Sequence, residues 1–133
     1  MSMSDELKGK VSLVTGGSGD IGGAIAKRLG QSGSTVVITY VGAEDLANQA
    51  VDEINADGGN ASALRLDQRD PNEIETIIGR VSQDYGRLDI LVNNAAWNIG
   101  IPFPNLDELT AEIWDRVLET NLRAPFLLAR AAA

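Results

Sequence analysis

Three glycines that follow a short apolar segment have the clearest chemical meaning in this chain. Gly16, Gly19 and Gly22 come after the apolar residues 11–15 and before a segment with helical periodicity. Such glycines let the backbone turn sharply and leave no side chain between the first helical turn and a bound phosphate. The free amides and the helix dipole would attract a pyrophosphate. The spacing predicts a nucleotide-binding turn, with a plain structural turn as the alternative.

Residue types that support other kinds of chemistry are missing. The 133 residues include no cysteine and no histidine, which argues against a thiolate metal site, a disulfide framework and imidazole catalysis, so we predict no metal site. The formal net charge of −8 would repel nucleic acid and acidic membrane surfaces. No apolar run approaches the roughly 20 residues of a membrane span. We expect a cytoplasmic protein that binds a small ligand, with no nucleic-acid or membrane partner.

Strand-like and helix-like segments alternate around these glycines. We predict strands at residues 11–15, 35–40, 61–66 and 88–92, and helices that begin near residues 21, 46, 70 and 110. The third helix has a complete start signal, with Asp70 as N-cap, Pro71 at the first position and Glu73 as a capping glutamate. A loop with Pro102 and Pro104 precedes the fourth helix, for which we predict an apolar side made of Trp114, Val117, Leu118 and Leu122. This alternation predicts an α/β fold with three αβα layers, in which a parallel sheet has helices on both faces.

Three motifs resemble those of the short-chain dehydrogenase/reductase family. They are Thr15-Gly16 with Gly22, the tetrad Asn93-Asn94-Ala95-Ala96 after the fourth strand, and Trp114-Asp115-x-Val117-Leu118-x-x-Asn121. The resemblance covers essentially the whole chain. It implies a Rossmann-type fold that binds NAD(H) or NADP(H) and transfers a hydride between nicotinamide and an alcohol or carbonyl carbon.

The resemblance also implies which residues contact the cofactor. The tetrad would back the cofactor and steady the sheet, and Asp67, with the amide of Gln68, would bind the adenine amino group. The implied cofactor-binding set is Gly16, Ser18, Gly19, Asp20, Ile21, Gly22, Tyr40, Asp67, Gln68, Asn93, Asn94, Ala95 and Ala96.

Two positions depart from the family pattern. Asp20 and Ala96 stand where the family has glycine. Asp20 either stabilises the helix start by about 0.3–1 kcal/mol or repels the pyrophosphate, and we favour the first. Ala96 adds one methyl group, which is tolerated unless the backbone needs a positive φ.

The choice between NADP and NAD depends on the end of the second strand. An acidic residue there would accept the ribose hydroxyls of NAD, and a basic residue would pair with the 2′-phosphate of NADP. The chain has Tyr40-Val41-Gly42, so neither charge is present. With no carboxylate to repel a phosphate, NADP is slightly favoured.

The catalytic part of the family pattern is incomplete. The family uses a serine and a tyrosine whose pKa is lowered by a lysine four residues later, whereas Tyr40 and Tyr85 are followed at that spacing by Glu44 and Asp89. Of the family's catalytic tetrad, only Asn121 is present. The alternative is that Asn121 is a structural residue whose side chain bonds to backbone. We therefore expect cofactor binding without turnover by this chain.

Two hypotheses remain for the whole chain. Residues 1–133 form either the dinucleotide-binding domain of a dehydrogenase, incomplete at the C-terminus and truncated to about four strands, or a noncatalytic nucleotide-binding or self-association module. In the first case the missing half would complete a site for a small uncharged alcohol or carbonyl substrate, approached by Trp97, Asn98, Ile99 and Phe103. In either case the apolar residues 88–92 and 126–128 predict a homo-oligomer or a fragment partner.

Overall fold

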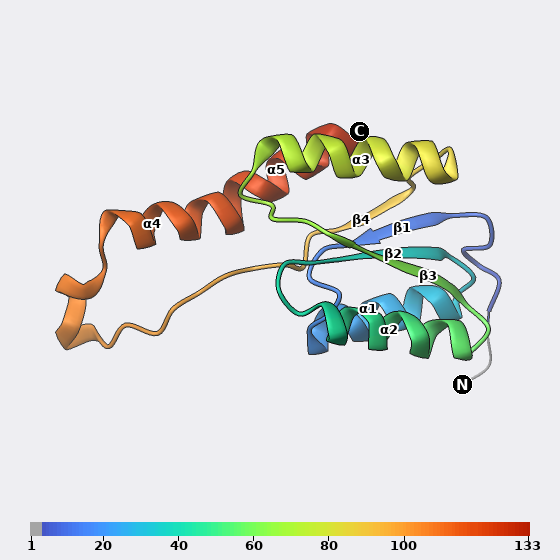
Figure 1. Cartoon of the computed structure of the whole chain (residues 1–133), viewed down its shortest axis with the longest axis horizontal. Coiled ribbons are helices and arrows are strands. Elements are labelled where there is room, and N and C mark those ends of the chain that lie inside the picture. Colours follow the sequence, from blue (N-terminus) through green and yellow to red (C-terminus); the bar gives the residue numbers. More distant parts are fainter. Residues whose placement is uncertain (1–3) are drawn as a thin grey trace.

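The computed structural model describes residues 4–133 and shows a parallel sheet between two layers of helices (Figure 1). The strands lie in the order β3-β2-β1-β4, and every pair of neighbours is parallel. The elements are β1 (Val11–Val14), α1 (Asp20–Gln31), β2 (Thr35–Tyr40), α2 (Glu44–Ala56), β3 (Asn60–Arg65), α3 (Pro71–Tyr85), β4 (Ile90–Val92), a 3₁₀ helix η1 (Phe103–Glu108), α4 (Ala111–Leu118), a π-helical turn η2 (Glu119–Arg123) and α5 (Ala124–Ala132). The predicted three-layer αβα fold with four parallel strands is confirmed.

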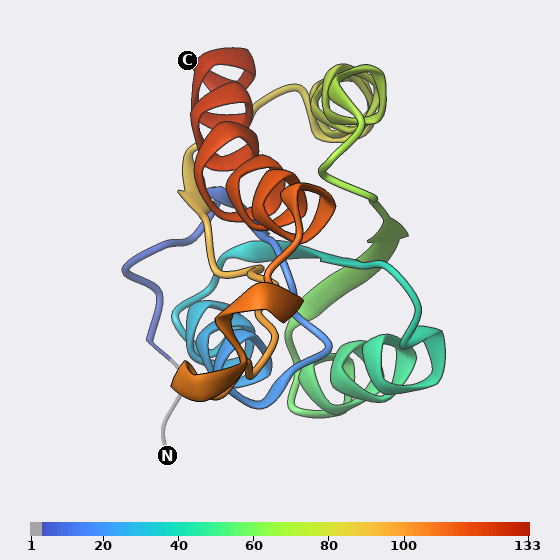
Figure 2. The ribbon, with the colours of Figure 1, turned by 90° about the vertical axis from the view of Figure 1, so that its left-hand side faces the viewer.

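Apolar side chains fill both faces of the sheet. On one face, Leu13 packs with α3 and α5 through Ile74 and Leu128. On the other face, Ile38 packs with α1 and α2 in a second cluster that includes Ile54. Figure 2 shows this arrangement end-on, with α3 and α5 above the strands and α1 and α2 below them. Both faces are covered, as a parallel sheet requires.

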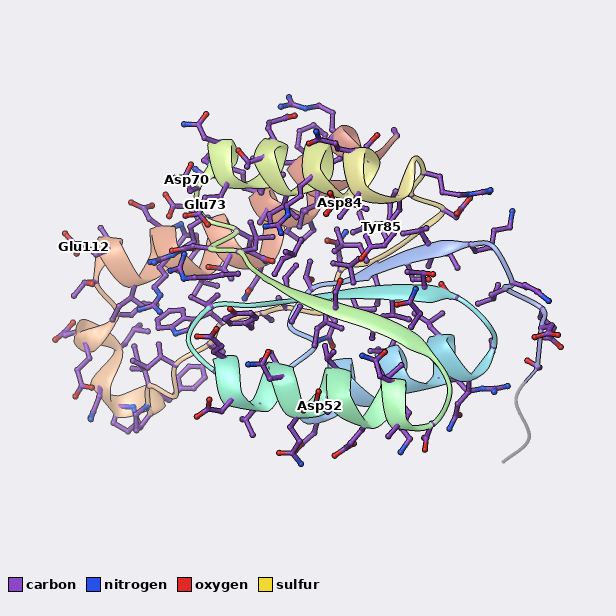
Figure 3. All side chains as sticks on the ribbon, turned by 45° about the vertical axis from the view of Figure 1, so that its right-hand side comes forward. Asp52, Asp70, Glu73, Asp84, Tyr85 and Glu112 are labelled. Carbon is purple, nitrogen blue, oxygen red and sulfur yellow. The ribbon has the colours of Figure 1, made fainter. Side chains whose placement is uncertain are left out.

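The third helix begins as predicted, with one difference. Asp70 accepts a hydrogen bond from the Asn72 amide at 2.8 Å, and Gly86 ends the helix with φ +74°. Glu73, however, does not cap the helix by reaching back to Asp70. Its Oε2 accepts a hydrogen bond from the Asp67 amide at 2.8 Å, and Glu73 thereby fixes the loop between β3 and α3. Asp70 and Glu73 lie at the start of α3, far from Asp84 and Tyr85 at its other end (Figure 3).

The segment between β4 and α5 projects beyond the sheet as an arm (Figure 1). The loop predicted around Pro102 and Pro104 contains the 3₁₀ helix η1, which has no buried residue. The apolar side predicted for the following helix meets no core, because Trp114, Leu118 and Leu122 are exposed. β4 lies at the edge of the sheet beside β1, and its three residues are only partly buried. The arm and this edge leave apolar surface open.

Within residues 4–133, no helix combines the length and the apolarity needed to cross a bilayer.

Asp89 joins the start of β4 to the start of β1. Its Oδ2 accepts hydrogen bonds from the Val11 amide at 2.9 Å and from Arg87 Nε at 2.8 Å, and its Oδ1 accepts one from Arg87 Nη2 at 2.7 Å. The Arg87 side chain, followed by the Val11 amide, lowers the pKa of Asp89 to about 2. A carboxylate held in this way stabilises the fold only while it is ionised.

We expect Asp89→Asn to remove part of the acid dependence of stability. The folded pKa lies below the unfolded value, so the Asp89 contribution is complete above about pH 4 and is lost as the pH falls towards 2. Urea midpoints at pH 7, 4 and 2.5 measure this dependence, which becomes flatter in the variant. Asp52, exposed on α2 (Figure 3), supplies the control Asp52→Asn, for which the wild-type profile is expected. Equal profiles for Asp89→Asn and wild type would contradict the assignment.

Candidate functional site

A cleft of about 650 Å³ lies at the carboxyl ends of the strands. Parallel strands end at the same edge of a sheet, so the loops that follow β1, β2, β3 and β4 meet there. Side chains of α4 and η2 complete the lining. The lining residues are Gly16, Ser18, Gly19, Asp20, Ile21, Gly22, Thr39, Tyr40, Val41, Gly42, Ala43, Leu66, Asp67, Gln68, Arg69, Asn94, Ala95, Ala96, Trp97, Arg116 and Thr120.

The glycine turn after β1 forms one wall of this cleft. Gly16 has φ +68°, a conformation that side chains other than glycine rarely adopt. A Cβ on Gly22 would lie 2.3 Å from the Gly16 carbonyl oxygen, so α1 starts in direct contact with the turn. Gly19 is the N-cap and brings no side-chain acceptor to the first turn of α1. The first-turn amides therefore stay open towards the cleft, as a phosphate site requires.

The space beside these amides suits a diphosphate. A Cβ on Gly19 would have only the Gly16 oxygen nearby, at 3.6 Å, so the turn approaches no other part of the protein there. Asp20 and Ile21 are exposed, and Ile21 has 72% of its surface accessible. The Asp20 carboxylate makes no hydrogen bond or ion pair with the described residues. It lies at the helix start, where negative charge is favourable, while the amides remain free for a ligand.

Thr15 and Asn94 join the glycine turn to the end of β4. The Thr15 hydroxyl accepts hydrogen bonds from the Asn94 amide at 3.1 Å and the Ala95 amide at 3.0 Å. The Asn94 side chain donates to the carbonyl oxygens of Thr15 at 3.0 Å and Gly16 at 3.2 Å. The asparagine thus holds the turn from behind through its backbone oxygens. Ala96 stays compatible with this loop, since no residue other than glycine has positive φ in the described chain.

The ends of β2 and β3 form a second part of the cleft. Burial raises the pKa of the Tyr40 hydroxyl, and the Glu44 carboxylate raises it further, so this hydroxyl remains a hydrogen-bond donor. Arg69 donates to both oxygens of Asp67, from Nε to Oδ1 at 3.1 Å and from Nη2 to Oδ2 at 2.8 Å. The Arg69 side chain also lowers the pKa of Asp67. Asp67 is therefore a fixed carboxylate at the cleft wall.

Trp97 lines the cleft and is held from two sides. The Asn121 side chain accepts from the Trp97 amide and donates to the Trp97 carbonyl, both at 2.8 Å. The Arg116 guanidinium stacks over the Trp97 ring at 3.9 Å from its centroid. Asn121 is part of the π-helical turn η2, a kind of irregularity often found at functional sites. Both of its hydrogen bonds go to backbone, which agrees with the alternative that Asn121 is a structural residue.

The predicted cofactor-binding residues line this cleft, except for Asn93. The Asn93 side chain points elsewhere and donates to the Pro125 carbonyl at 3.4 Å, which joins β4 to α5. Sequence reasoning missed four polar lining residues: Thr39, Arg69, Arg116 and Thr120. Arg69 could have been suspected from its place two residues after Asp67. Thr39 belongs to β2, Arg116 to α4 and Thr120 to η2, and no local pattern marks any of them as a lining residue.

The described residues do not complete an acid–base site. Tyr85 lies away from the cleft, with its hydroxyl 3.0 Å from Ser62 Oγ on β3, and no lysine lines the cleft. Residues 4–133 contain no group of three or more Asp, Glu, His or Cys side chains that could hold a metal ion. The arrangement can bind an anionic ligand through the open amides of the glycine turn.

Comparisons with known proteins agree with this arrangement. A family model described as short chain dehydrogenase matches residues 10–133. The versicolorin reductase stcU of Emericella nidulans is 38% identical over 134 residues, which cover 99% of this chain and 50% of that relative. The chain thus spans about half the length of the curated relatives that it matches.

Solved structures give the same result. A dehydrogenase/reductase from Sinorhizobium meliloti 1021 superposes with a TM-score of 0.90 and 45% identity, over 97% of this chain and 50% of that one. A short chain dehydrogenase from Burkholderia cenocepacia J2315, crystallised in complex with NADP, has a TM-score of 0.89 and 42% identity, over 96% of this chain and 51% of that one.

Proposed function

The chain belongs to the short-chain dehydrogenase family, and on this premise we propose that it is the dinucleotide-binding part of an NAD(P)-dependent oxidoreductase. The observation that carries the proposal is the glycine turn, whose open amides face the cleft of about 650 Å³. The substrate of the complete protein would be a small uncharged alcohol or carbonyl compound. When bound, the nicotinamide supplies hydride transfer to or from such a carbon.

The residues of this chain would bind and orient the dinucleotide. The first turn of α1 would hold the pyrophosphate, and Asn94 would keep the turn rigid through the Thr15 and Gly16 oxygens. The Asp67 region would take the adenosine end. Trp97, fixed by Asn121, would then border the nicotinamide end, where substrate must approach. The proton-transfer groups of the family are not among these residues, so turnover requires a further part of the protein.

NADP is the preferred cofactor in this proposal. Tyr40, Val41 and Gly42 are all uncharged, so none of these residues would itself repel a 2′-phosphate, and Glu44 is the carboxylate near the Tyr40 hydroxyl. The Burkholderia cenocepacia relative, 42% identical, was crystallised with NADP, which supports the same choice.

Calorimetric titration with NADPH and NADH tests the proposal directly. We expect weak binding of at least one dinucleotide at millimolar concentration, about −4 kcal/mol, because the chain holds the phosphates and adenosine but lacks catalytic contacts to nicotinamide. Activity towards alcohols and ketones is expected only after a C-terminal half is supplied. If neither dinucleotide binds, the noncatalytic association module becomes the better description.

We also propose that two copies of the chain associate through the outer face of α4, η2 and α5. Leu118, Leu122 and Phe126 border an apolar hollow of about 740 Å³ on this face. Asp115, Glu119 and Arg123 also line the hollow, and Glu119 pairs with Arg123 of the same chain at 3.6 Å. Beyond the hollow, the Arg130 guanidinium lies over the Phe126 ring. An antiparallel pair would bury the apolar stripe of both copies and bring Asp115 of each copy towards Arg130 of its partner.

Leu122→Glu is expected to convert a dimer into a monomer. Leu122 has 67% of its surface accessible at the centre of the stripe, and a pair of copies would bury two new carboxylates there. Light scattering measures the mass. Leu46→Glu is the matched control, because Leu46 is 55% accessible on α2, in the other helical layer. A monomeric wild type, or equal dissociation by both variants, would contradict the proposed interface.

A further inference from the structure

We propose that Trp97 and Arg116 form a stacking platform for the flat aromatic ring of an uncharged carbonyl substrate. This inference rests on the proposed function and deepens it, because it names a substrate class: an aryl ketone or aldehyde, or the corresponding alcohol. Both side chains line the cleft. Trp97 is half-buried there and Arg116 is exposed.

The guanidinium of Arg116 offers one of its two faces to a ligand. Its Cζ lies over the Trp97 ring, 3.9 Å from the ring centroid, so Trp97 covers the first face. A guanidinium is planar and carries its N–H donors at the edge, which leaves the second face free for stacking. No other aromatic ring lies over Arg116 in residues 4–133. Because Arg116 is exposed and lines the cleft, a flat ring can reach this second face.

The charge of Arg116 is also left for a ligand. Of the two arginines that line the cleft, Arg69 pairs with Asp67, with Nη2 2.8 Å from Oδ2. Arg116 makes no ion pair with any carboxylate of residues 4–133. A cation without a carboxylate partner keeps its attraction for the negative face of an aromatic ring.

A single helical run fixes both members of the platform. Arg116 belongs to α4, which continues directly into η2. Asn121 of η2 accepts from the Trp97 amide and donates to the Trp97 carbonyl, both at 2.8 Å. The backbone of Trp97 and the cation over its ring are therefore held by the same stretch of chain. A pair that is fixed before binding loses little conformational entropy when a ring stacks on it.

The chain around Trp97 suits a ligand without charge. Residues 93–106 contain no charged side chain. Beyond Trp97, the arm exposes Ile99 and Phe103, which are 44% and 94% accessible. A saturated carbonyl compound matches these apolar side chains but gains nothing from the cation. An aromatic one gains from both, so we expect the aromatic compound to bind more tightly.

The test compares two uncharged ketones, 2-acetylnaphthalene and its saturated analogue 2-acetyldecalin, by equilibrium dialysis against the whole chain with NADPH bound. The saturated ketone has the larger apolar surface, so hydrophobic burial alone would favour it. Stacking on a cation favours 2-acetylnaphthalene, and we expect it to bind about threefold more tightly. Equal affinities, or tighter binding of 2-acetyldecalin, would overturn the platform while the proposed function stands. Absence of dinucleotide binding in the separate calorimetric titration would overturn both.

Arg116→Met removes the charge and the plane but keeps the length of the side chain. The preference for 2-acetylnaphthalene is expected to vanish in this variant. Arg80→Met is the matched control, because Arg80 lies on α3, pairs with Asp84 at 3.6 Å and does not line the cleft. The control should keep the wild-type preference. A merely structural role would weaken both ketones alike in Arg116→Met and leave the preference unchanged, and that result would overturn the assignment. Thermal unfolding confirms that each variant is folded.

Fluorescence locates the bound ring. The chain has two tryptophans, and Trp114 is 57% accessible on α4, so Trp114→Phe leaves Trp97 as the reporter. We expect 2-acetylnaphthalene to quench Trp97 with NADPH bound as well as without it. Displacement of the ketone by NADPH would assign the platform to a ring of the dinucleotide and overturn the substrate role. Binding of 2-naphthoate more than about tenfold tighter than the ketone would make Arg116 an anion site and overturn the uncharged class.

Discussion

Gly22→Ala is expected to lower dinucleotide affinity by about a hundredfold and to destabilise the fold. The added Cβ would lie 2.3 Å from the Gly16 carbonyl oxygen and 2.6 Å from Asn94 Nδ2, distances at which the backbone must move. Displacement of the turn removes charge-assisted hydrogen bonds from the phosphates, at about 1.5–3 kcal/mol each. Overpacking against backbone costs a further ~1–3 kcal/mol of unfolding free energy. Calorimetry and urea denaturation measure the two effects.

Gly23→Ala is the matched control, one residue further along α1. Its Cβ would meet only the Gly17 oxygen, at 3.5 Å, which is ordinary contact. Replacing a helical glycine with alanine stabilises a helix by about 0.5–1 kcal/mol. The two neighbouring substitutions should therefore change the free energy of unfolding in opposite directions. Gly22→Ala lowers it, and Gly23→Ala raises it. Comparable stability and affinity in both variants would show that the turn does not depend on the close approach of Gly22.

Thr15→Val is expected to destabilise the chain by about 1–3 kcal/mol. Thr15 is 1% accessible, and its hydroxyl accepts from the Asn94 and Ala95 amides. Valine keeps the shape of threonine but leaves the Ala95 amide without an acceptor, whereas the Asn94 amide keeps the Val92 carbonyl at 3.0 Å. The free energy of unfolding in urea gives the loss, and dinucleotide titration should show weaker binding as the glycine turn loosens.

Thr15→Ser separates the hydroxyl from the methyl group. Serine keeps the acceptor and loses one buried methyl, at about 1 kcal/mol. The predicted order of stability is wild type, then Thr15→Ser, then Thr15→Val. A Thr15→Val variant as stable as Thr15→Ser would mean that packing, and not the pair of accepted hydrogen bonds, holds β1 against the loop after β4.

The layers and the first three helices could be predicted because local signals agreed with the global arrangement. Residues 35–40 are β-branched or aromatic and pair with both neighbours, and Asp70 and Gly86 mark the ends of α3. The glycine turn followed from its place between a strand and a helix. Residues at several strand ends then had to meet, because parallel strands finish at one edge.

The second half of the cleft wall could not be predicted from local patterns. Thr120 reaches the wall through a hydrogen bond from Gln68, 52 residues away, and nothing in residues 119–123 indicates a π-helical turn. The apolar pattern of Trp114, Leu118 and Leu122 predicts a helix face but does not say that this face stays exposed. Glu73 satisfied the rule for a capping box and instead bonds to Asp67. In each case tertiary packing selected among partners that local chemistry allowed.

The hydrogen bonds between Thr15 and the residues after β4 also impose an order on assembly. They connect positions 79 and 80 residues apart, and β4 pairs only with β1. Contacts of such long sequence separation form late in folding because a large loop must close first. During synthesis the turn after β1 emerges early, yet it acquires its supports only once residues 94 and 95 have left the ribosome. Nascent chains shorter than this would carry the glycines without a formed anion site.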